Sequence, residues 1–263
     1  MVYSKELLFI HIPKCAGTSV EKCLGLHNKK RFGYGVLRGK ALQHRTYREY
    51  QEDMGNKIKK LESFTIVRNP YDRCISEYYW NPIVGVKSGI TFNQFLNKIG
   101  QIVKNFNYKK RIKHFNDHHM RQYEFILGTN GTPSVDKIFY YENLDALKEY
   151  IEKYSVIPFP HSNISKKRQL TVENLTLYQK KKIEEIYLKD FEYFNYSILS
   201  HNNKNEIVTN QNKELVIRNE AKEPIKKGLK SSTPYLRRQR LLNQEIRRLN
   251  IRKTKNYSSI PNV

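Results

Sequence analysis

The stretch "FIHIPKCAGTSVEKCLG", residues Phe9–Gly25, runs from an apolar segment through a small-residue turn into a helical pattern. A strand that ends in a tight, glycine-containing turn at a helix N-terminus is a common way to hold a phosphate. Its lysine, Lys14, precedes the glycine, Gly17, whereas the lysine of a P-loop follows the last glycine. The stretch therefore predicts a P-loop-like anion site, with an ordinary capped turn and a solvated lysine as the alternative.

A second stretch, "SFTIVRNPYDRCISEYYW", repeats this arrangement. Arg68 follows the apolar run Phe64–Val67, Pro70 prepares a helix start, and Ser76 lies about two turns into that helix. Arginine can grip a phosphate through two N–H groups while a serine hydroxyl donates a further hydrogen bond. The alternative is a surface arginine beside a capped helix. Two such strand ends suit a ligand with two separated phosphates, and no Walker B acid or magnesium-binding set accompanies them.

The rest of the pattern predicts an α/β fold. Apolar runs predict buried parallel strands at Leu7–Ile12, Phe64–Val67 and Lys137–Tyr141. Helical spacing predicts helices over Thr18–Leu24, Tyr47–Asp53, Tyr71–Trp80, Thr91–Ile99, Leu144–Tyr154 and Val172–Phe194. We expect a three-layer sandwich with a central parallel sheet and a P-loop-like loop. Ligands of such sheets bind at the carboxyl ends of the strands, where both phosphate motifs fall.

The composition changes after Ser200, which predicts a domain over residues 1–199 and a basic tail over 200–263. The tail after Ser200 holds 15 Lys and Arg against 5 acidic residues. Thr233 followed by Pro234 predicts the start of a basic helix, so we expect a partly helical or disordered extension. Two interpretations stay open, a solvated extension or an electrostatic hook for an anionic polymer or a membrane surface.

The charge and the cysteine content limit the classes of function that the protein can have. The formal net charge of the 263 residues is +23, which predicts attraction to a polyanion without selecting nucleic acid, membrane or an acidic substrate. The three cysteines have no metal-ligand spacing and cannot all pair, so a reducing compartment is the simpler interpretation. The sequence shows no secretory signal and no apolar run of membrane-spanning length, so we expect a cytoplasmic protein.

At this point the motifs resemble a known family. "HIPKCAGTS" and "TIVRNPYDRCISEY" are similar to the 5′-phosphosulfate and 3′-phosphate motifs of sulfotransferases that use 3′-phosphoadenylyl sulfate (PAPS), specifically the carbohydrate branch of Golgi-type glycan sulfotransferases. Four later segments continue the likeness: "NDHHMRQYEFI", "VDKIFYYENLDAL", "PHSNISKKR" and "KKKIEEIYLKDFEYFNY". The six segments keep the family's order over Phe9–Tyr196 and leave the tail uncovered.

The resemblance implies a role for each matching residue. The 5′-phosphosulfate would be bound by Lys14 with the amides and hydroxyls of Ala16, Gly17, Thr18 and Ser19. Arg68 and Ser76 would hold the 3′-phosphate, and Arg168 would close over the nucleotide. This chain departs from the family at Cys15, where the family usually has Thr, and at Arg121, where it usually has Pro. Arg121 and His118 fall on the acceptor side, and His118 would position the substrate or brace the site.

His44 is the candidate general base, because related glycan sulfotransferases carry a catalytic histidine between the two phosphate motifs. Thr46 and Glu49 form a capping-box pattern, which places His44 just before a helix N-terminus. The helix dipole disfavours imidazolium there and keeps the ring able to accept a proton near neutral pH. The alternative is a surface histidine in a loop. We expect His119 to be structural and His11 to be a hydrogen-bonded core residue.

These observations predict a sulfotransferase that moves the sulfuryl group of PAPS to a hydroxyl in line, with Lys14 and His44 as catalytic residues and no metal. A saccharide is the favoured acceptor class, and a glycan, glycolipid or small alcohol would all be compatible. One alternative is another phosphate-binding, kinase-like enzyme, although a metal-binding acid and a glycine-rich loop are missing from the sequence near Lys14. The other is a nucleic-acid-binding protein, which explains the charge but not two ordered anion loops; we expect no specific nucleic acid as partner.

Overall fold

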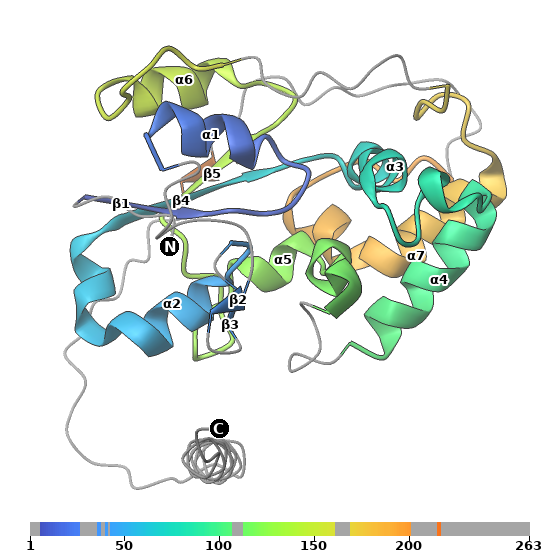
Figure 1. Ribbon diagram of the computed structural model, residues 1–263, viewed down its shortest axis with the longest axis horizontal. Coiled ribbons are helices and arrows are strands. Elements are labelled where there is room, and N and C mark those ends of the chain that lie inside the picture. The colour runs from blue at the N-terminus through green and yellow to red at the C-terminus, as the bar shows by residue number, and fades with distance from the viewer. Residues whose placement is uncertain are drawn as a thin grey trace, which may run out of the picture. The chain divides into compact units, whose positions relative to one another are not determined.

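The computed structural model of the chain describes residues 6–26, 36–37, 40–41, 43–106, 113–160, 169–200 and 215–216. Its main sheet has four strands in the order β1 (Leu7–Ile10), β4 (Glu62–Val67), β5 (Lys137–Tyr140) and β6 (Leu215–Val216). The first three strands are parallel, and β6 pairs with β5 in the antiparallel sense. A small hairpin, β2 (Val36–Leu37) and β3 (Lys40–Ala41), forms a separate sheet. Figure 1 shows β1 beside β4 in the sheet.

The buried strands follow from their composition. All four residues of β1 are buried, as are the last five of β4, and strands buried on both faces need the continuous apolar runs that these segments carry. The register pairs Phe9 with Phe64 and Ile10 with Thr65. The polar Thr65 is accommodated because its hydroxyl donates a hydrogen bond of 2.7 Å to the Ile10 carbonyl. The carboxyl ends of β1 and β4 therefore lie side by side, and each is followed by one of the two phosphate motifs.

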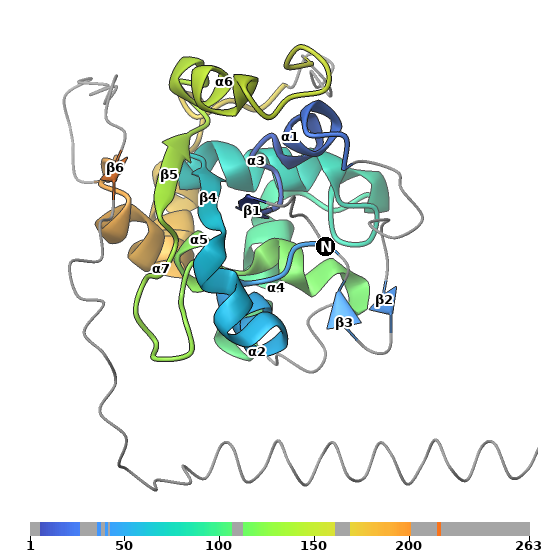
Figure 2. The same ribbon diagram turned by 90° about the vertical axis from the view of Figure 1, so that its left-hand side faces the viewer.

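Helices flank the sheet and extend beyond it. The described helices are α1 (Gly17–Cys23), α2 (Tyr47–Met54), α3 (Pro70–Trp80), α4 (Phe92–Lys104), α5 (Gln122–Phe125), α6 (Asp145–Glu152) and α7 (Leu177–Tyr193). Three short 3-10 segments are η1 (Gly55–Lys60), η2 (Val86–Ser88) and η3 (Lys113–His119). Figure 2 shows α1 and α6 on one side of the strands β4 and β5 and α2 on the other. Capping boxes at Thr46, Thr91 and Thr176 fix the starts of α2, α4 and α7.

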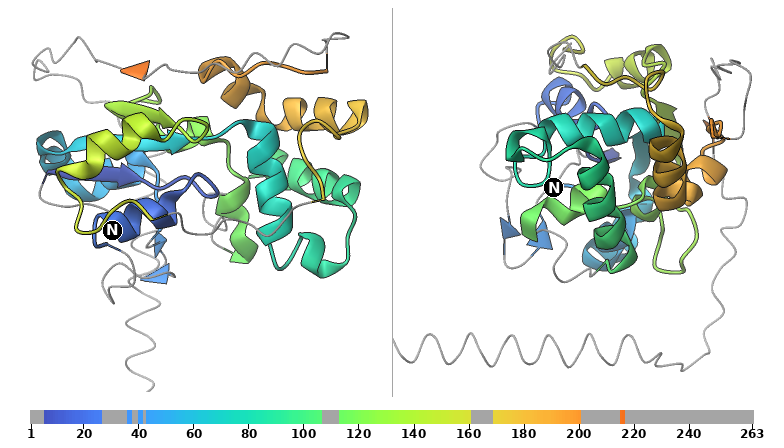
Figure 3. Two further views of the ribbon diagram at one scale, coloured as in Figure 1. Left: turned by 90° about the horizontal axis from the view of Figure 1, so that it is seen from above. Right: turned by 90° about the vertical axis from the view of Figure 1, so that its right-hand side faces the viewer.

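Two hydrophobic clusters hold the described residues together. The first surrounds the sheet and includes Leu8, Phe64 and Ile138, each of which is fully buried. The second joins α3, α4 and α7 through residues such as Tyr71, Phe95 and Phe191. Figure 3 shows these three helices gathered at one end, away from α1 and the β1–β4 strands. Part of the chain's stability is therefore helix-on-helix packing that involves no strand.

The α/β class with a parallel sheet is confirmed. All three predicted strands and all six predicted helices outside the tail are present, with shifted ends: α4 continues to Lys104, and α7 begins at Leu177 rather than Val172. The sequence did not predict α5, the 3-10 segments, the hairpin or β6, and β6 lies beyond the expected domain boundary at residue 199. The predicted tail helix lies outside the described residues. Among the helices that are described, none combines the length and apolar character needed to cross a bilayer.

Candidate active site

The loop after β1 is bent into an unusual backbone conformation. Lys14 has φ of 68° and Ala16 has φ of 60°, values that non-glycine residues seldom adopt. The bend ends at Gly17, where α1 begins. A Cβ atom at Gly17 would lie 2.1 Å from Cδ2 and Nε2 of His11, so only glycine fits against this ring. In the described part of the chain, no acceptor contacts the backbone N–H groups of Gly17 and Thr18. These amides can therefore donate to an anion.

Arg68 connects the second motif directly to the first. Its Nη1 donates a 3.0 Å hydrogen bond to the Lys14 carbonyl, and its Nε donates a 2.7 Å bond to Asp72. Nη2 also pairs with Asp72, and the guanidinium lies 3.9 Å from the ring centroid of Tyr141. A guanidinium has five N–H groups, so these contacts leave two for an anion. The two predicted phosphate motifs therefore meet at one edge of the sheet.

A buried glutamine holds the backbone of Arg68 in place. The Gln122 amide accepts from the Arg68 backbone N–H at 2.9 Å and donates to the Arg68 carbonyl at 2.8 Å, so it continues β4 as a strand neighbour would. Gln122 begins α5, where Asp190 of α7 accepts from the backbone N–H groups of Gln122 and Tyr123 at 2.9 Å each. The position of Arg68 therefore depends on a contact between α5 and α7.

The other predicted site residues lie within helices, against α7 or outside the described residues. Ser19 and Ser76 are buried within α1 and α3. Arg121 donates from Nε to the Ile186 carbonyl at 3.0 Å and pairs with Glu124, so it lies against α7 and contacts neither His44 nor His118 in the described structure. Its acceptor role stays a prediction. Arg168 lies outside the described residues.

We call the loop between β1 and α1 the anion loop. A row of four side chains leads from this loop to the predicted base, and we call these residues the site row: Lys14, Trp80, His118 and His44. The Lys14 Nζ atom lies 4.9 Å from the Trp80 ring centroid. The indole stacks on His118 at 4.3 Å between centroids and 9° between planes. The His118 and His44 rings meet edge to face at 4.7 Å. These residues come from the β1 loop, the end of α3, η3 and the loop before α2, which the fold brings together.

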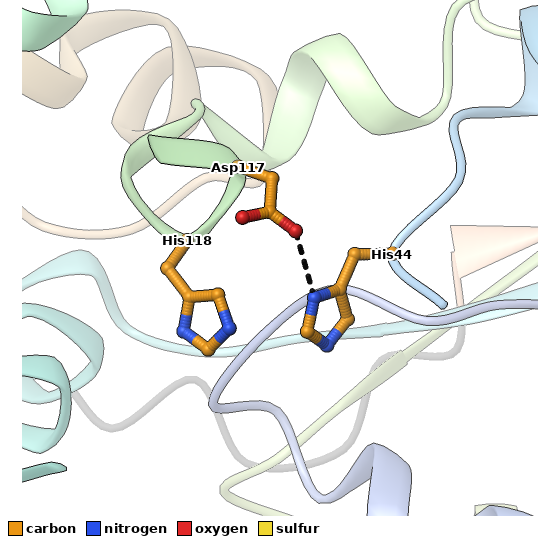
Figure 4. A group of neighbouring side chains, drawn as sticks. All are labelled: His44, Asp117 and His118. Carbon is orange, nitrogen blue, oxygen red and sulfur yellow. Dashed lines mark hydrogen bonds and ion pairs between the residues drawn. The ribbon is translucent and has the colours of Figure 1, made fainter. Parts of the chain in front are cut away.

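Asp117 holds His44 in one orientation. The His44 Nδ1 atom lies 3.0 Å from Asp117 Oδ2, as the dashed line in Figure 4 shows. A carboxylate only accepts, so Nδ1 carries the proton and Nε2 keeps a lone pair. Burial lowers the pKa of His44 to about 3, although the hydrogen bond to Asp117 opposes the shift. The backbone φ of His44 is 50°, and three of the four non-glycine residues with positive φ in the described segments lie in this site.

The neighbouring histidines are also held by carboxylates. His118 Nδ1 lies 3.0 Å from Glu77 Oε2, and His11 Nδ1 lies 2.6 Å from Glu21 Oε1. Burial raises the pKa of Glu77, but His118 and His119 outweigh it and hold that pKa near 2. His11 is 5% exposed, which confirms the expected hydrogen-bonded core histidine. His119 is fully buried and packs near Phe95, as expected of a structural residue.

Several important neighbours were not predicted from the sequence. Asp117, Glu77 and Glu21 orient the histidines, and Trp80 links Lys14 to His118. The sequence signal for Asp117 was its place beside His118, inside a segment already singled out. Glu77 lies next to Ser76 and Trp80 ends the same helical pattern, but neither residue type by itself indicated a role.

Comparison with protein families gives one match. The model of the family described as "Sulfotransferase family" matches residues 1–197, which is most of the chain and includes every residue of the site row. Searches of curated proteins and of solved structures gave no match.

Proposed function

Because this chain belongs to the sulfotransferase family, we propose that it transfers the sulfuryl group of PAPS to a saccharide hydroxyl, with His44 as general base. Family membership makes the protein a PAPS-dependent transferase rather than a kinase-like enzyme. The assignment to the carbohydrate branch, the acceptor and the mechanism are our proposal. The observation that carries it is the site row, which joins a cation at the anion loop to an oriented imidazole.

The residues at the sheet edge fit a nucleotide with two phosphates. When PAPS is bound, it supplies the sulfuryl group and a phosphate leaving group. On the 5′ side we assign Lys14 with the amides and hydroxyls of the turn at residues 16–19, where two N–H groups lack an acceptor in the described structure. On the 3′ side we assign Arg68, with two N–H groups left, and Ser76. We retain Arg168 as a nucleotide contact on the family resemblance alone.

We assign the proton transfer to Nε2 of His44. The acceptor hydroxyl must lose its proton as its oxygen bonds to sulfur, and a neutral imidazole with a lone pair on Nε2 can accept that proton. Asp117 keeps the second ring proton on Nδ1 and stabilises the imidazolium that forms. Since burial disfavours imidazolium in the resting site, His44 is neutral and ready to accept a proton at pH 7.

Lys14 acts on the opposite side of the reaction. Negative charge grows on the leaving phosphate as the bond to sulfur breaks, and an ammonium placed there stabilises that charge. The Trp80 ring, which also stacks on His118, attracts the Lys14 ammonium at 4.9 Å from its centroid. His118 lies between the two ends of the row, and we propose that it contacts the acceptor, with Glu77 fixing its ring.

A saccharide acceptor is supported by the family resemblance and by the environment of the row. Trp80 is 38% exposed and stacks on His118, and an indole offers a flat apolar surface to a sugar ring. The net charge of +23 favours an anionic glycan over a neutral one. Glycolipids and small alcohols remain the alternatives that an assay has to separate.

The test is incubation of the protein with labelled PAPS and a panel of glycans, glycolipids and small alcohols. We expect label on a glycan, with loss of transfer in Lys14→Ala and His44→Ala. Lys22→Ala is the matched control, because it removes a lysine from the last turn of α1 and should leave transfer unchanged. Failure to bind adenosine 3′,5′-bisphosphate would contradict the nucleotide site, and full transfer in both site variants would contradict the catalytic roles.

A further inference from the structure

We propose that His44, Asp117 and His118 bind a transition-metal dication such as Zn²⁺, and that the bound ion blocks transfer. One ligand atom from each residue lies within 4.8 Å of the other two. Figure 4 shows the three side chains converging, two from η3 and one from the loop before α2. The metal binding rests on this geometry alone, whereas the block on transfer also rests on the proposed base role of His44.

The cluster has the composition of a metal centre. Two imidazoles and one carboxylate are a common protein contribution to a zinc site that keeps a fourth position open. The three side chains are 5% to 13% exposed, so they are largely shielded from solvent. Ligand atoms around a tetrahedral ion lie about 3.3 Å apart, as bonds of about 2.0–2.1 Å require. The widest separation must therefore close by roughly 1.5 Å, which rotation of the histidine side chains can provide.

Glu77 provides the second observation. Histidines that bind metals usually donate their other ring N–H to a carboxylate, which fixes the ring and increases its basicity. His118 has this arrangement, because its Nδ1 lies 3.0 Å from Glu77 Oε2 and Nε2 is the ligand atom that remains to be offered. Glu77 is itself held by the Asn81 side-chain amide at 2.8 Å. Two buried carboxylates, Asp117 and Glu77, thus place negative charge beside the cluster in a strongly basic protein.

The ligand set selects the class of ion. Imidazole nitrogen suits Zn²⁺, Co²⁺, Ni²⁺ and Cu²⁺, whereas Mg²⁺ and Ca²⁺ prefer oxygen-rich sites. An ion on Nδ1 of His44 would replace the hydrogen bond to Asp117. The ring proton would then lie on Nε2, which would no longer have the lone pair that accepts the proton of the acceptor hydroxyl. We therefore expect Zn²⁺ to inhibit transfer without weakening the binding of adenosine 3′,5′-bisphosphate, because Arg68 and the anion loop are not ligands.

The direct test is a titration of the full chain with Co²⁺, followed by visible absorption in the absence of PAPS. We expect the intense d–d bands of four- or five-coordinate cobalt at one equivalent, abolished in His44→Asn and in His118→Asn. Glu77→Gln keeps all three ligands and should weaken Co²⁺ binding about 10–100-fold. Glu149→Gln is the control, since it removes an exposed carboxylate of α6 that is not one of the three ligands and should leave the titration unchanged.

Asp117→Asn keeps the side-chain volume, so it separates the loss of a ligand from misfolding. This variant should bind Co²⁺ more weakly, and its circular dichroism spectrum should match that of the wild type. Bands that survive in both histidine variants, or a spectrum of six-coordinate aqueous cobalt throughout, would overturn the metal site. The titration needs no transfer activity, so its result is independent of the proposed reaction. Cobalt binding at the cluster without inhibition by Zn²⁺ would instead contradict His44 as the base.

Discussion

His44, Lys14 and Ala16 share a backbone conformation that costs free energy. Left-handed φ values at non-glycine residues cost on the order of 1–3 kcal/mol each and persist where the surroundings enforce them. In the described segments such residues lie in the anion loop and at His44, apart from Asn195, which follows α7 closely. The conformation aims the Lys14 and His44 side chains into one site, and this is what the proposed reaction requires.

We expect Asp117 to affect catalysis through His44, whose ring it orients. Asp117→Asn should lower kcat by less than His44→Asn, whose loss we place at about 10²–10⁴-fold. The reason is that an amide no longer fixes the proton on Nδ1 or stabilises the imidazolium, while the ring remains. Steady-state kinetics check this: kcat should fall while the KM for PAPS holds. An equal fall in Asp72→Asn, whose partner is Arg68, would argue for a general electrostatic effect.

Glu21 should make stability depend on acid pH. Burial raises the pKa of Glu21, but the His11 imidazole and the Gln43 amide lower it by more, to about 2 from an ordinary value near 4.5. A depressed carboxyl pKa stabilises the fold above the unfolded value and loses that contribution as pH falls toward 2. Denaturant unfolding between pH 5 and 2 should show a loss of up to about 3 kcal/mol in the wild type.

Glu21→Gln tests the origin of that acid loss. It should be less stable at pH 6 and should show a flatter pH dependence between pH 5 and 2. Glu149→Gln, which alters an exposed carboxylate of α6 outside this histidine cluster, is the control and should keep the wild-type slope. A Glu21→Gln profile parallel to that of the wild type would show that the His11 pair does not set the acid sensitivity.

The sequence predicted individual site residues better than their partners. Lys14 and Arg68 were singled out by local signals, a strand end and a following proline, and His44 was singled out by its place in the family pattern. Asp117 lies 73 positions from His44 and Glu77 lies 41 from His118, so those contacts exist only after folding. The contact of Arg121 with the Ile186 carbonyl spans 65 positions and was likewise not predictable, and its role toward the acceptor stays a prediction.

At the scale of elements, the start of α1 is a tightly constrained position. Gly17→Ala would place a Cβ atom 2.1 Å from the His11 ring, and neither the ring nor the helix can move without disturbing the anion loop. We expect a loss of about 1–3 kcal/mol in unfolding free energy and weaker binding of adenosine 3′,5′-bisphosphate. Thermal unfolding and calorimetric titration measure the two effects.

Gly100→Ala is the matched control for that substitution. Its Cβ atom would lie 3.5 Å from Ile186 Cδ1, which is ordinary contact, inside the helix α4. Alanine is the better helix former, so this variant should be neutral or more stable by up to about 1 kcal/mol. Equal behaviour of the two variants would show that the His11–Gly17 approach does not constrain the loop.

Elements with a clear local sequence pattern were predictable, and elements that depend on distant partners were not. The strands β1, β4 and β5 are apolar, and α4 and α7 carry clear caps, so local pattern sufficed. The four-residue α5 depends on Asp190 accepting its first backbone N–H groups from 67 and 68 positions away. The two-residue β6 pairs with β5 from within a polar segment, where Leu215, Val216 and Ile217 form an apolar run too short to predict a strand.

At the scale of the whole molecule, the sheet and the helical cluster each contribute to the site. Lys14 follows a strand of the sheet, while Trp80 ends a helix whose buried face belongs to the cluster of α3, α4 and α7. The geometry of the site row therefore depends on both hydrophobic clusters, the one around the sheet and the one that joins α3, α4 and α7. A variant that loosens α3 should disturb catalysis even without touching the nucleotide residues.

The basic tail can be tested separately from the site. Strand β6 contributes to the sheet, so a truncation should end after Asn219, the end of the compact unit that contains the described residues. Residues 220–263 hold 12 Lys and Arg against 3 Glu. If the tail attracts an anionic acceptor, its removal should raise the KM for an anionic glycan and leave the KM for a small alcohol unchanged. Unchanged kinetics with every acceptor would exclude the hook interpretation.

The most direct test of the central claim is one comparison: transfer from labelled PAPS to the best glycan, together with the affinity for adenosine 3′,5′-bisphosphate, in the wild type, His44→Asn and Arg68→Ala. We predict that His44→Asn loses transfer by about 10²–10⁴-fold and keeps the nucleotide affinity, whereas Arg68→Ala loses the affinity. Transfer by His44→Asn at the wild-type rate, or nucleotide affinity unchanged in Arg68→Ala, would contradict the account.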